Sequence, residues 1–245
     1  MRTSMRAFYR VLSEGASDSR LIDRHGLTAA VVPTAPNRSV CNGVVYESPE
    51  ALAGSLDELA TTYEGAGVCA WTVWVPKRDR ESARLLERAG HALDAEPAGM
   101  ALELDRFEGR LRTGIEVGRD GNPAEVGRIN DIAYGYDGDL TRTLEGLPSD
   151  AAHLYFTREG GEAIACAGAL DHEGDCCILF VATLPVARGR GLATELMTRA
   201  LLDARERGCT TTSLQATKMG KPVYERMGYR DLGPLQMWER RFSQT

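Results

Sequence analysis

One stretch of this chain, 181–194, constrains the fold and the chemistry more than any other. It begins as an apolar run typical of a buried strand and passes through a short turn into a glycine-rich loop that opens a helix. Backbone N–H groups at a helix start have no intrahelical partner, and the helix dipole adds partial positive charge there. Gly189 and Gly191 have no side chain, so a phosphate can approach the main chain closely. With the added cations Arg188 and Arg190, the segment predicts an anion cradle suited to a pyrophosphate.

The size and charge of the chain limit its partners. A length of 245 residues suggests one large domain or two small ones. The net charge of -6 argues against nucleic acid as the main partner, because basic faces drive that binding. No apolar run approaches the ~18 residues of a membrane span, and the N-terminus lacks the apolar core of a signal peptide. We therefore expect no membrane association.

Cysteine and histidine usage favours a reduced compartment and no metal site. The six cysteines show no CxxC spacing and fall mostly in apolar, strand-like segments: Cys41, Cys69, Cys166, Cys176, Cys177 and Cys209. We expect them to be reduced core residues of a cytoplasmic protein. The four histidines have no metal-ligand spacing: His25, His91, His153 and His172.

The second half of the chain alternates between strand and helix patterns. Strands are expected at 113–118, 153–157, 162–170, 177–183, 210–216 and 236–242, and helices at 122–133, 140–147, 191–207 and 222–227. The run Asn122-Pro123-Ala124-Glu125 has an N-cap side chain, a proline at the first helical position and a glutamate at the third. A helix should therefore begin there.

The first half repeats this order of elements. Residues 86–91 (LERAGH) parallel residues 224–229 (YERMGY), and each segment follows a strand and precedes an apolar strand with a methionine. A helix expected at 49–63 precedes the first segment, as 191–207 precedes the second. We interpret this as one unit used twice, joined by the charged stretch 105–112. A degenerate domain is predicted over residues 1–108 and a complete one over 109–245.

The two units differ where chemistry would occur. The first has no counterpart of the loop 188–193, and its helix begins at Ser48-Pro49-Glu50, where the Glu50 carboxylate repels a phosphate. It has Leu86 where the second unit has Tyr224. The first unit is therefore expected to keep the scaffold without the site.

These motifs resemble the GNAT superfamily of acetyl-CoA-dependent N-acetyltransferases. The signature [Gln/Arg]-x-x-Gly-x-[Gly/Ala] is met by Arg188, Gly191 and Ala193, and the tyrosine before a Gly-aromatic pair by Tyr224. The resemblance covers 113–242, and 5–105 as a degenerate copy. It implies an α/β fold (α+β by some schemes) of two tandem GNAT-like units. Each unit would be a mixed, mostly antiparallel twisted sheet with helices on both faces and a splayed central strand pair.

The resemblance also implies the ligand and the roles of single residues. Acetyl-CoA would bind as the acyl donor, without a metal, and Tyr224 would act as the acid at the sulfur. The Val181 N–H would stabilise the oxyanion. The residues implied in binding the cosubstrate are Val181, Ala182, Thr183, Arg188, Gly189, Arg190, Gly191, Leu192, Ala193, Thr194 and Thr217. Thr217 stands where many members have asparagine, and Gly220 where alanine is common, so the acceptor side departs from the pattern.

A general base is not evident from the residues. His172, Glu173 and Asp175 form a turn that we interpret as solvated. The polar residues at the end of the helix after 122 border the acceptor pocket in the family, but their bare pattern is more typical of helix surface and cap: Asn130, Asp131, Tyr134 and Tyr136. A cysteine nucleophile lacks a supporting histidine motif.

The expected function is acetyl transfer to a primary amine of a small-molecule or peptide acceptor, by direct attack in a ternary complex. This is an acyltransferase activity of class EC 2.3.1.-. One alternative is a catalytically silent acyl-CoA-binding or sensing protein. A second is nucleotide-dependent chemistry at Gly189-x-Gly191-x-x-Thr194, which lacks the third glycine of the dinucleotide fingerprint. The identity of the acceptor and a homodimeric state stay open.

Overall fold

The computed structural model describes residues 1–24 and 26–242, so His25 lies outside the described residues. In the first half of the chain the elements are α1 (Arg2–Gly15), β1 (Arg20–Arg24), β2 (Leu27–Val31), β3 (Gly43–Tyr46), α2 (Pro49–Ala53), α3 (Leu56–Gly65), β4 (Ala70–Pro76), α4 (Arg80–Arg88), β5 (Ala92–Ala95) and β6 (Ala98–Glu103). In the second half they are α5 (Pro123–Tyr134), α6 (Asp139–Leu144), β7 (His153–Glu159), β8 (Glu162–His172), β9 (Asp175–Thr183), α7 (Leu192–Glu206), β10 (Thr211–Ala216), α8 (Lys221–Arg226) and β11 (Arg230–Arg241). Short 3-10 turns lie at Leu104–Arg106 and Pro185–Ala187.

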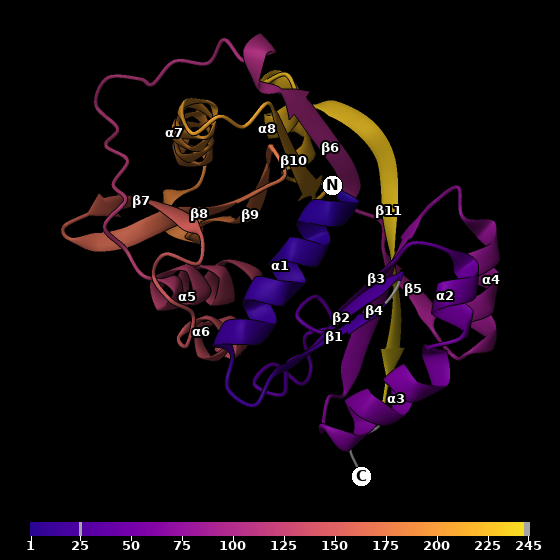
Figure 1. Ribbon diagram of the computed structural model, residues 1–245. Helices are drawn as coiled ribbons and strands as arrows, with labels where there is room; N and C mark the ends of the chain where they lie inside the picture. The colour runs from indigo at the N-terminus through magenta and orange to yellow at the C-terminus, as the bar shows by residue number, and fades with distance from the viewer. Residues whose placement is uncertain (25, 243–245) are drawn as a thin grey trace.

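These strands join in one mixed sheet with helices on both faces (Figure 1). The order of the eleven described strands is β1-β2-β3-β4-β11-β6-β10-β9-β8-β7, with β5 beside β11. Only the pairs β3–β4 and β9–β10 are parallel. The predicted fold class, a mostly antiparallel mixed sheet covered on both faces, is confirmed.

The helices divide between the two faces because strand residues alternate in direction. On β8, Ala165 packs in the core under α7, whereas its neighbour Cys166 packs in the core with α1, α5 and α6. In the first half, Val31 packs in the core with α2, α3 and α4, and Ala30 packs on the α1 side. The core around α1 therefore contains residues from both halves, so the two halves form one packed body.

Each half of the sheet takes its last strand from the other half of the chain. Strand β6 lies between β10 and the first part of β11, where Arg230 pairs with Ala101. The later part of β11, from Leu235 to Arg241, leaves that site and pairs with β4. This reciprocal exchange fixes the halves to each other through backbone ladders. The division of the chain near residue 108 stays a prediction, and the exchange means that sheet halves and chain halves do not coincide.

Three expected elements differ in the structure. The segment 113–118 makes a single bridge, Gly118 to Phe156, because Gly114 has φ +92°, which interrupts an extended strand. The helix expected at 49–63 is broken into α2 and α3 at Gly54. The final strand begins at Arg230 rather than 236, since its first part pairs with β6.

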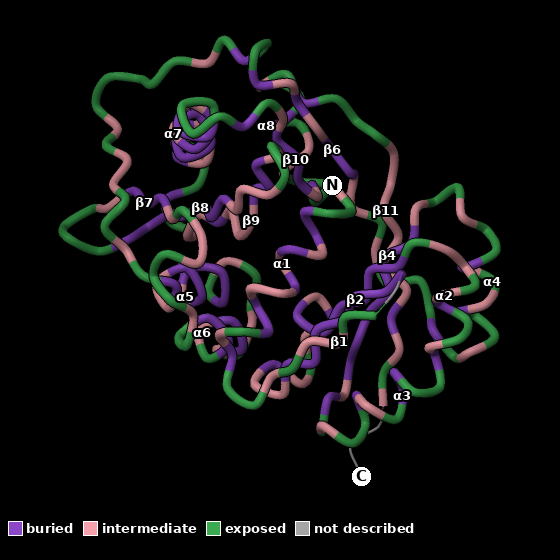
Figure 2. Tube along the Cα trace, in the orientation of Figure 1, coloured by how far each residue is buried: buried purple, intermediate pink, exposed green. Residues whose placement is uncertain are grey.

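The segment between the two halves of the chain runs over the surface. Residues 108–122 are mostly exposed and carry no regular element (Figure 2). The capping box at Asn122 that ends this segment is confirmed: its side chain accepts from the Glu125 N–H, and the Glu125 carboxylate accepts from the Asn122 N–H. In the part of the chain that the structure describes, no helix combines the length and apolar character needed to cross a membrane.

Candidate active site

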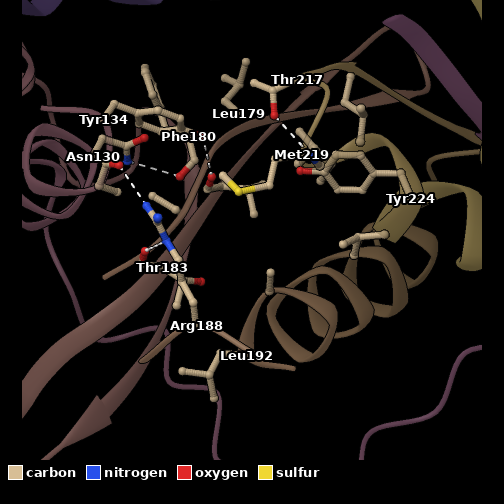
Figure 3. Close-up of a pocket in the computed structure, with 18 of the residues that line it drawn as sticks. Asn130, Tyr134, Leu179, Phe180, Thr183, Arg188, Leu192, Thr217, Met219 and Tyr224 are labelled. Atoms are coloured by element: carbon tan, nitrogen blue, oxygen red, sulfur yellow. Dashed lines mark hydrogen bonds between the residues drawn. The ribbon is translucent and has the colours of Figure 1, made fainter. Parts of the chain in front are cut away.

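The parallel strands β9 and β10 separate part-way along their length. They pair from Asp175 with Thr211 to Cys177 with Ser213, and no further pair follows. Beyond that point Ile178 to Thr183 on β9, with Leu214 and Gln215 on β10, line a cavity of about 510 Å³. We call it the loop-side cavity, because the loop before α7 forms its other wall (Figure 3). The splayed strand pair expected in this half is present.

A bulge in β9 turns its backbone at this cavity. Phe180 has φ +52°, a left-handed conformation uncommon for a residue with a side chain, and the β8–β9 register shifts at the same place. The Phe180 carbonyl accepts from Asn130 Nδ2 at 3.2 Å and lies 3.4 Å from Cys166 Sγ. The Tyr134 hydroxyl donates to the Val181 carbonyl at 3.2 Å. Residues of α5 therefore hold the bulge in place.

The loop before α7 leaves its main-chain donors available. Gly191, at φ +79°, is the N-cap of α7, and no side chain caps the helix. Among the described residues, no group accepts a hydrogen bond from the amides of residues 189–194. The first amide of the helix with an internal partner is that of Glu195, which donates to the Gly191 carbonyl at 3.2 Å. Unpaired amides at a helix start, reinforced by the dipole, favour an anion.

Arg112, from the exposed segment between the halves, reaches this helix start. Its Nη2 donates to the Gly191 carbonyl at 3.1 Å, and its Nε and backbone N–H donate to the two carboxylate oxygens of Glu195 at 2.5 and 2.9 Å. Glu195 is buried in the first turn of α7. A Cβ on Gly191 would lie 2.2 Å from Arg112 Nη2 and displace that guanidinium, but it is the φ of +79° that requires a glycine here. Nothing in the local sequence marked Arg112.

The two cations expected to strengthen the cradle both bond to other groups of the protein. Arg190 forms an ion pair with Glu159 at 3.1 Å. Arg188 donates to the Ala133 carbonyl at 2.9 Å and to the Thr183 carbonyl at 3.4 Å, which links the loop to α5 and β9. Both guanidinium groups therefore bond to groups of the protein, and their part in binding an anion stays a prediction. The donors without a partner at this helix start are main-chain amides.

Tyr224, on α8, faces the loop-side cavity from the side of β10. Its side chain is mostly buried, and among the described residues its hydroxyl has no hydrogen-bond partner. In Figure 3 the ring points toward Thr217 and Met219. Burial raises the pKa of Tyr224 above its ordinary value, so the hydroxyl is a neutral donor at physiological pH. A Cβ on Gly220 would lie 3.0 Å from the Tyr224 ring, so the small residue leaves room for the ring.

The cavity brings together nearly all of the residues expected from the sequence. Those that line it are Val181, Ala182, Thr183, Arg188, Gly189, Gly191, Leu192, Ala193, Thr194, Thr217 and Tyr224. Arg190 is not among its lining residues.

For the residues at the end of α5, the bare pattern favours helix surface and cap, whereas the resemblance places them beside the acceptor pocket. Tyr134 is exposed and also lines the cavity, so the two interpretations overlap. Asn130, Tyr134 and Tyr136 line the cavity. The tyrosines stack with ring centroids 5.8 Å apart. Asp131 is indeed a cap, because its carboxylate accepts from the Leu140 and Thr141 amides at the start of α6. Two tyrosines spaced two residues apart at the end of this helix were the available signal.

The turn after β8 does not contribute to the cavity. The Asp175 carboxylate accepts from the hydroxyls of Ser4, Thr211 and Ser213 at 2.5 to 2.8 Å, which ties α1 to β9 and β10. Within residues 1–24 and 26–242, no cluster of three or more histidine, cysteine or acidic side chains is placed to hold a metal ion.

A second cavity, of about 840 Å³, lies between the two halves, and we call it the interhalf cavity. Tyr9, Trp74 and Met237 contribute to it from α1, β4 and β11. Tyr134, Tyr136, Phe180 and Gln215 line both cavities. The splayed strands therefore separate a cavity at the helix start from one walled by both halves.

The sequence of the second half matches a known family. Residues 125–229, which contain the bulged strand, the open helix start and Tyr224, match the acetyltransferase (GNAT) family. The similarity to this family covers 105 of the 245 residues, all in the second half of the chain. Search of the curated proteins gave no match.

Solved GNAT structures resemble the chain over nearly its whole length. A GCN5-related N-acetyltransferase from Kribbella flavida is 17% identical with a TM-score of 0.69, covering 99% of this chain and 96% of that one. One from Sphaerobacter thermophilus is 18% identical with a TM-score of 0.59, covering 90% and 82%. A tandem GNAT protein from the clavulanic acid biosynthesis pathway is 12% identical with a TM-score of 0.61, covering 98% and 95%. These likenesses establish the fold over both halves.

Proposed function

We propose that this protein is an acetyl-CoA-dependent N-acetyltransferase that transfers the acetyl group to a primary amine. The observation that carries the proposal is the set of unpaired amides at residues 189–194, at the mouth of a cavity between two splayed strands. The match of residues 125–229 to an acetyltransferase family supports the same reaction class.

The residues present fit the parts of acetyl-CoA. The diphosphate matches main-chain donors at a helix start, where a Cβ on Gly191 would collide with Arg112. The edge of β9 that faces β10 has no strand pairs past Cys177, and it suits the amide-bearing pantetheine arm, which can add to a strand edge. Bound there, acetyl-CoA supplies an activated acetyl thioester.

The chain's own groups would then act on charge and protons. We propose that the Tyr224 hydroxyl donates its proton to the departing sulfur, since burial keeps it protonated. We propose that the Val181 N–H, next to the bulge, stabilises negative charge on the acetyl oxygen. The cavity would hold the amine against the thioester, which removes most of the entropy of encounter.

Two measurements test this proposal together. Titration calorimetry of the purified protein with acetyl-CoA should give one site per chain, and release of CoA thiol should accelerate with an amine. Absence of acetyl-CoA binding would contradict the proposal. Binding without thiol release on any amine of a broad panel would favour the silent sensing protein instead.

A cytoplasmic location is part of the proposal and follows from the cysteines. No disulfide joins the six of them in the described part of the chain, and burial raises the pKa of the Cys166 thiol to about 12. Such buried thiols are weak nucleophiles, which also disfavours a cysteine mechanism. Fractionation of the native host would test the location.

A further inference from the structure

Gln215 has a buried polar atom without a partner. It lies near the end of β10, two residues after Ser213, so both side chains are on the same face of the strand. Ser213 donates to Asp175 at 2.5 Å. The Gln215 Nε2, by contrast, is buried and has no hydrogen-bond partner among the described residues.

An unsatisfied buried donor needs a reason. Leaving one unpaired costs about 1–3 kcal/mol, so nearly all buried polar groups in proteins are bonded. Gln215 stands just past the point where β10 leaves β9, and it lines both the loop-side and the interhalf cavities. Its amide is therefore at the junction where a donor thioester and an acceptor would meet.

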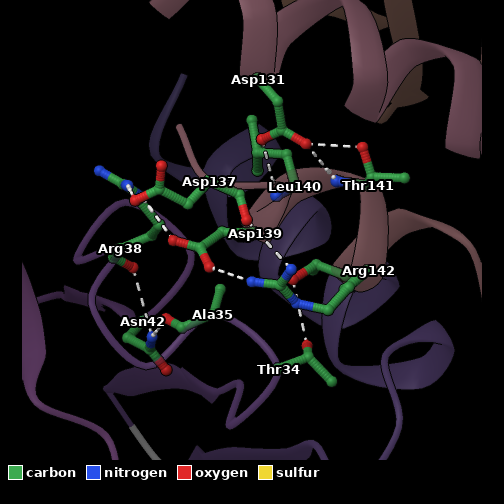
Figure 4. A network of polar contacts seen from close by, with 11 residues as sticks. Thr34, Ala35, Arg38, Asn42, Asp131, Asp137, Asp139, Leu140, Thr141 and Arg142 are labelled. Atoms are coloured by element: carbon green, nitrogen blue, oxygen red, sulfur yellow. Dashed lines mark hydrogen bonds and ion pairs between the residues drawn. The ribbon is translucent and has the colours of Figure 1, made fainter. Parts of the chain in front are cut away.

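Most of the charged groups around this junction have partners in the protein. The charged residues that line the interhalf cavity are Arg38, Asp94, Glu96, Lys218, Glu239 and Arg241. Glu239 pairs with Arg241 at 2.5 Å, and Glu96 with Lys77 at 3.5 Å. Arg38 donates to Asp139 (Figure 4). Its guanidinium also lies 4.3 Å from the centroid of the Tyr136 ring, which fixes that wall. At the junction itself, the buried polar atom that lacks a partner among the described residues belongs to a neutral amide, that of Gln215.

From this geometry we infer that Gln215 contacts the acceptor, and that the acceptor is a primary amine with a hydrogen-bonding oxygen close to its nitrogen. The Nε2 group donates to that oxygen, as found in an amino-acid amide or an amino alcohol. The contact holds the neighbouring amine at the bulge of β9, facing Tyr224. The inference rests on the proposed acetyl transfer and adds the acceptor class to it.

Two probe amines of matched shape test the inference. Alaninamide has a carbonyl next to the carbon that bears the amine, and sec-butylamine replaces that carboxamide by an ethyl group. Each is assayed with acetyl-CoA as donor, in wild-type protein and in Gln215→Leu. The change in the ratio of their kcat/KM values between the two proteins isolates the contact, because the intrinsic reactivity of each amine cancels. We expect the ratio to fall at least about tenfold in Gln215→Leu, as for other sites built to hydrogen-bond a substrate group.

A stability measurement separates this role from a structural one. Removing an unsatisfied donor should leave the Tm of Gln215→Leu unchanged or raise it. Thr157→Val is the matched control, since the buried Thr157 hydroxyl on β7 also lacks a partner among the described residues. It should keep both the Tm and the probe ratio. Gln215→Met, which retains the chain length, replaces the leucine variant if that one does not fold.

The possible outcomes separate the role of Gln215, the acceptor class and the proposed function. An unchanged probe ratio in a variant that binds acetyl-CoA and turns over the amines would overturn the role of Gln215. Turnover of neither probe by wild-type protein that binds acetyl-CoA and acetylates another amine would overturn the acceptor class. Failure of wild-type protein to bind acetyl-CoA would instead remove the proposed function itself.

Discussion

In each half of this molecule a helix follows a strand that pairs in parallel with its neighbour. The first amides of the two helices differ, because a side chain caps one helix and not the other. At α2 the Ser48 side chain accepts from the Ala51 N–H, and Glu50 occupies the first turn. At α7 the N-cap is Gly191, and no side chain caps the helix. The first helix start is therefore closed by the chain itself, whereas the second is open to an anion. The same architecture supports a site only where its donors are left unpaired.

The first turns also differ in the charge around their carboxylates. Glu195 in α7 is buried and paired with Arg112, which neutralises it beside the open amides. Glu50 in α2 is exposed, and its hydrogen bond to Ser48 lowers the pKa of its carboxyl group. Within the described residues, no cation forms an ion pair with it. An anion would be repelled at α2 and tolerated at α7.

The first half also shapes the second. Its strand β6 completes the ladder beside β10, and Trp74 and Tyr9 wall the interhalf cavity. The Trp74 Nε1 donates to the Tyr9 hydroxyl at 2.6 Å, which fixes that wall. The first half therefore contributes to the sheet beside β10 and to the wall of the interhalf cavity.

The largest effect is expected from a change that closes the open start of α7. Gly191→Val forces a side chain into a left-handed conformation and onto Arg112, so we expect acetyl-CoA affinity to fall roughly 1,000-fold by calorimetry. Gly208→Ala is the control: its φ is +95°, but its Cβ would meet open space beyond the far end of α7. Equal losses in the two variants would assign the effect to backbone strain alone.

The next largest effect should come from Tyr224, which stands where the first half has the fully buried Leu86. Tyr224→Phe should lower kcat about 100-fold with acetyl-CoA affinity unchanged, because it removes only the acid. The raised pKa of Tyr224 also predicts no loss of wild-type kcat from its titration between about pH 7 and pH 9.

Tyr229→Phe is the matched control for that variant. The Tyr229 hydroxyl bonds to Thr212 at 2.9 Å in the buried core, so its loss should lower stability by about 1 kcal/mol and leave kcat intact. Full kcat in Tyr224→Phe would remove this tyrosine as the acid.

A smaller effect should follow from removing the cation that neutralises Glu195. Arg112→Ala leaves a buried carboxylate beside the open amides, and we expect acetyl-CoA affinity to fall about tenfold. Adding Glu195→Gln should restore most of the affinity, because the uncompensated charge is then gone. A double variant as weak as the single one would show that Arg112 binds the ligand directly.

The smallest effect is expected at the closed helix start of the first half. Ser48→Ala removes the cap of α2 and should lower the free energy of unfolding by about 1 kcal/mol in urea. Calorimetry should still give one acetyl-CoA per chain, since Glu50 continues to repel an anion there. A second acetyl-CoA site in this variant would contradict the view that the charge of Glu50, as well as the cap, keeps an anion from the start of α2.

Short-range features of the site were predictable from the sequence. The glycines at 189 and 191, the capping box at Asn122 and the position of Tyr224 each depend on residues a few places apart. The repeat of 86–91 and 224–229 likewise indicated the order of elements. The prediction of a strand at 113–118 failed because Gly114 takes a positive φ that the pattern does not reveal.

By itself, the sequence determined where a helix starts without a cap and which half can therefore attract an anion, because capping and dipole effects act within one turn. Only the tertiary structure decided which side chains surround that start. Arg112 meets Glu195 across 83 positions of the chain, β11 exchanges places with β6, and Gln215 faces walls built from both halves. Such contacts depend on how whole elements pack, and no local pattern of residues encodes them.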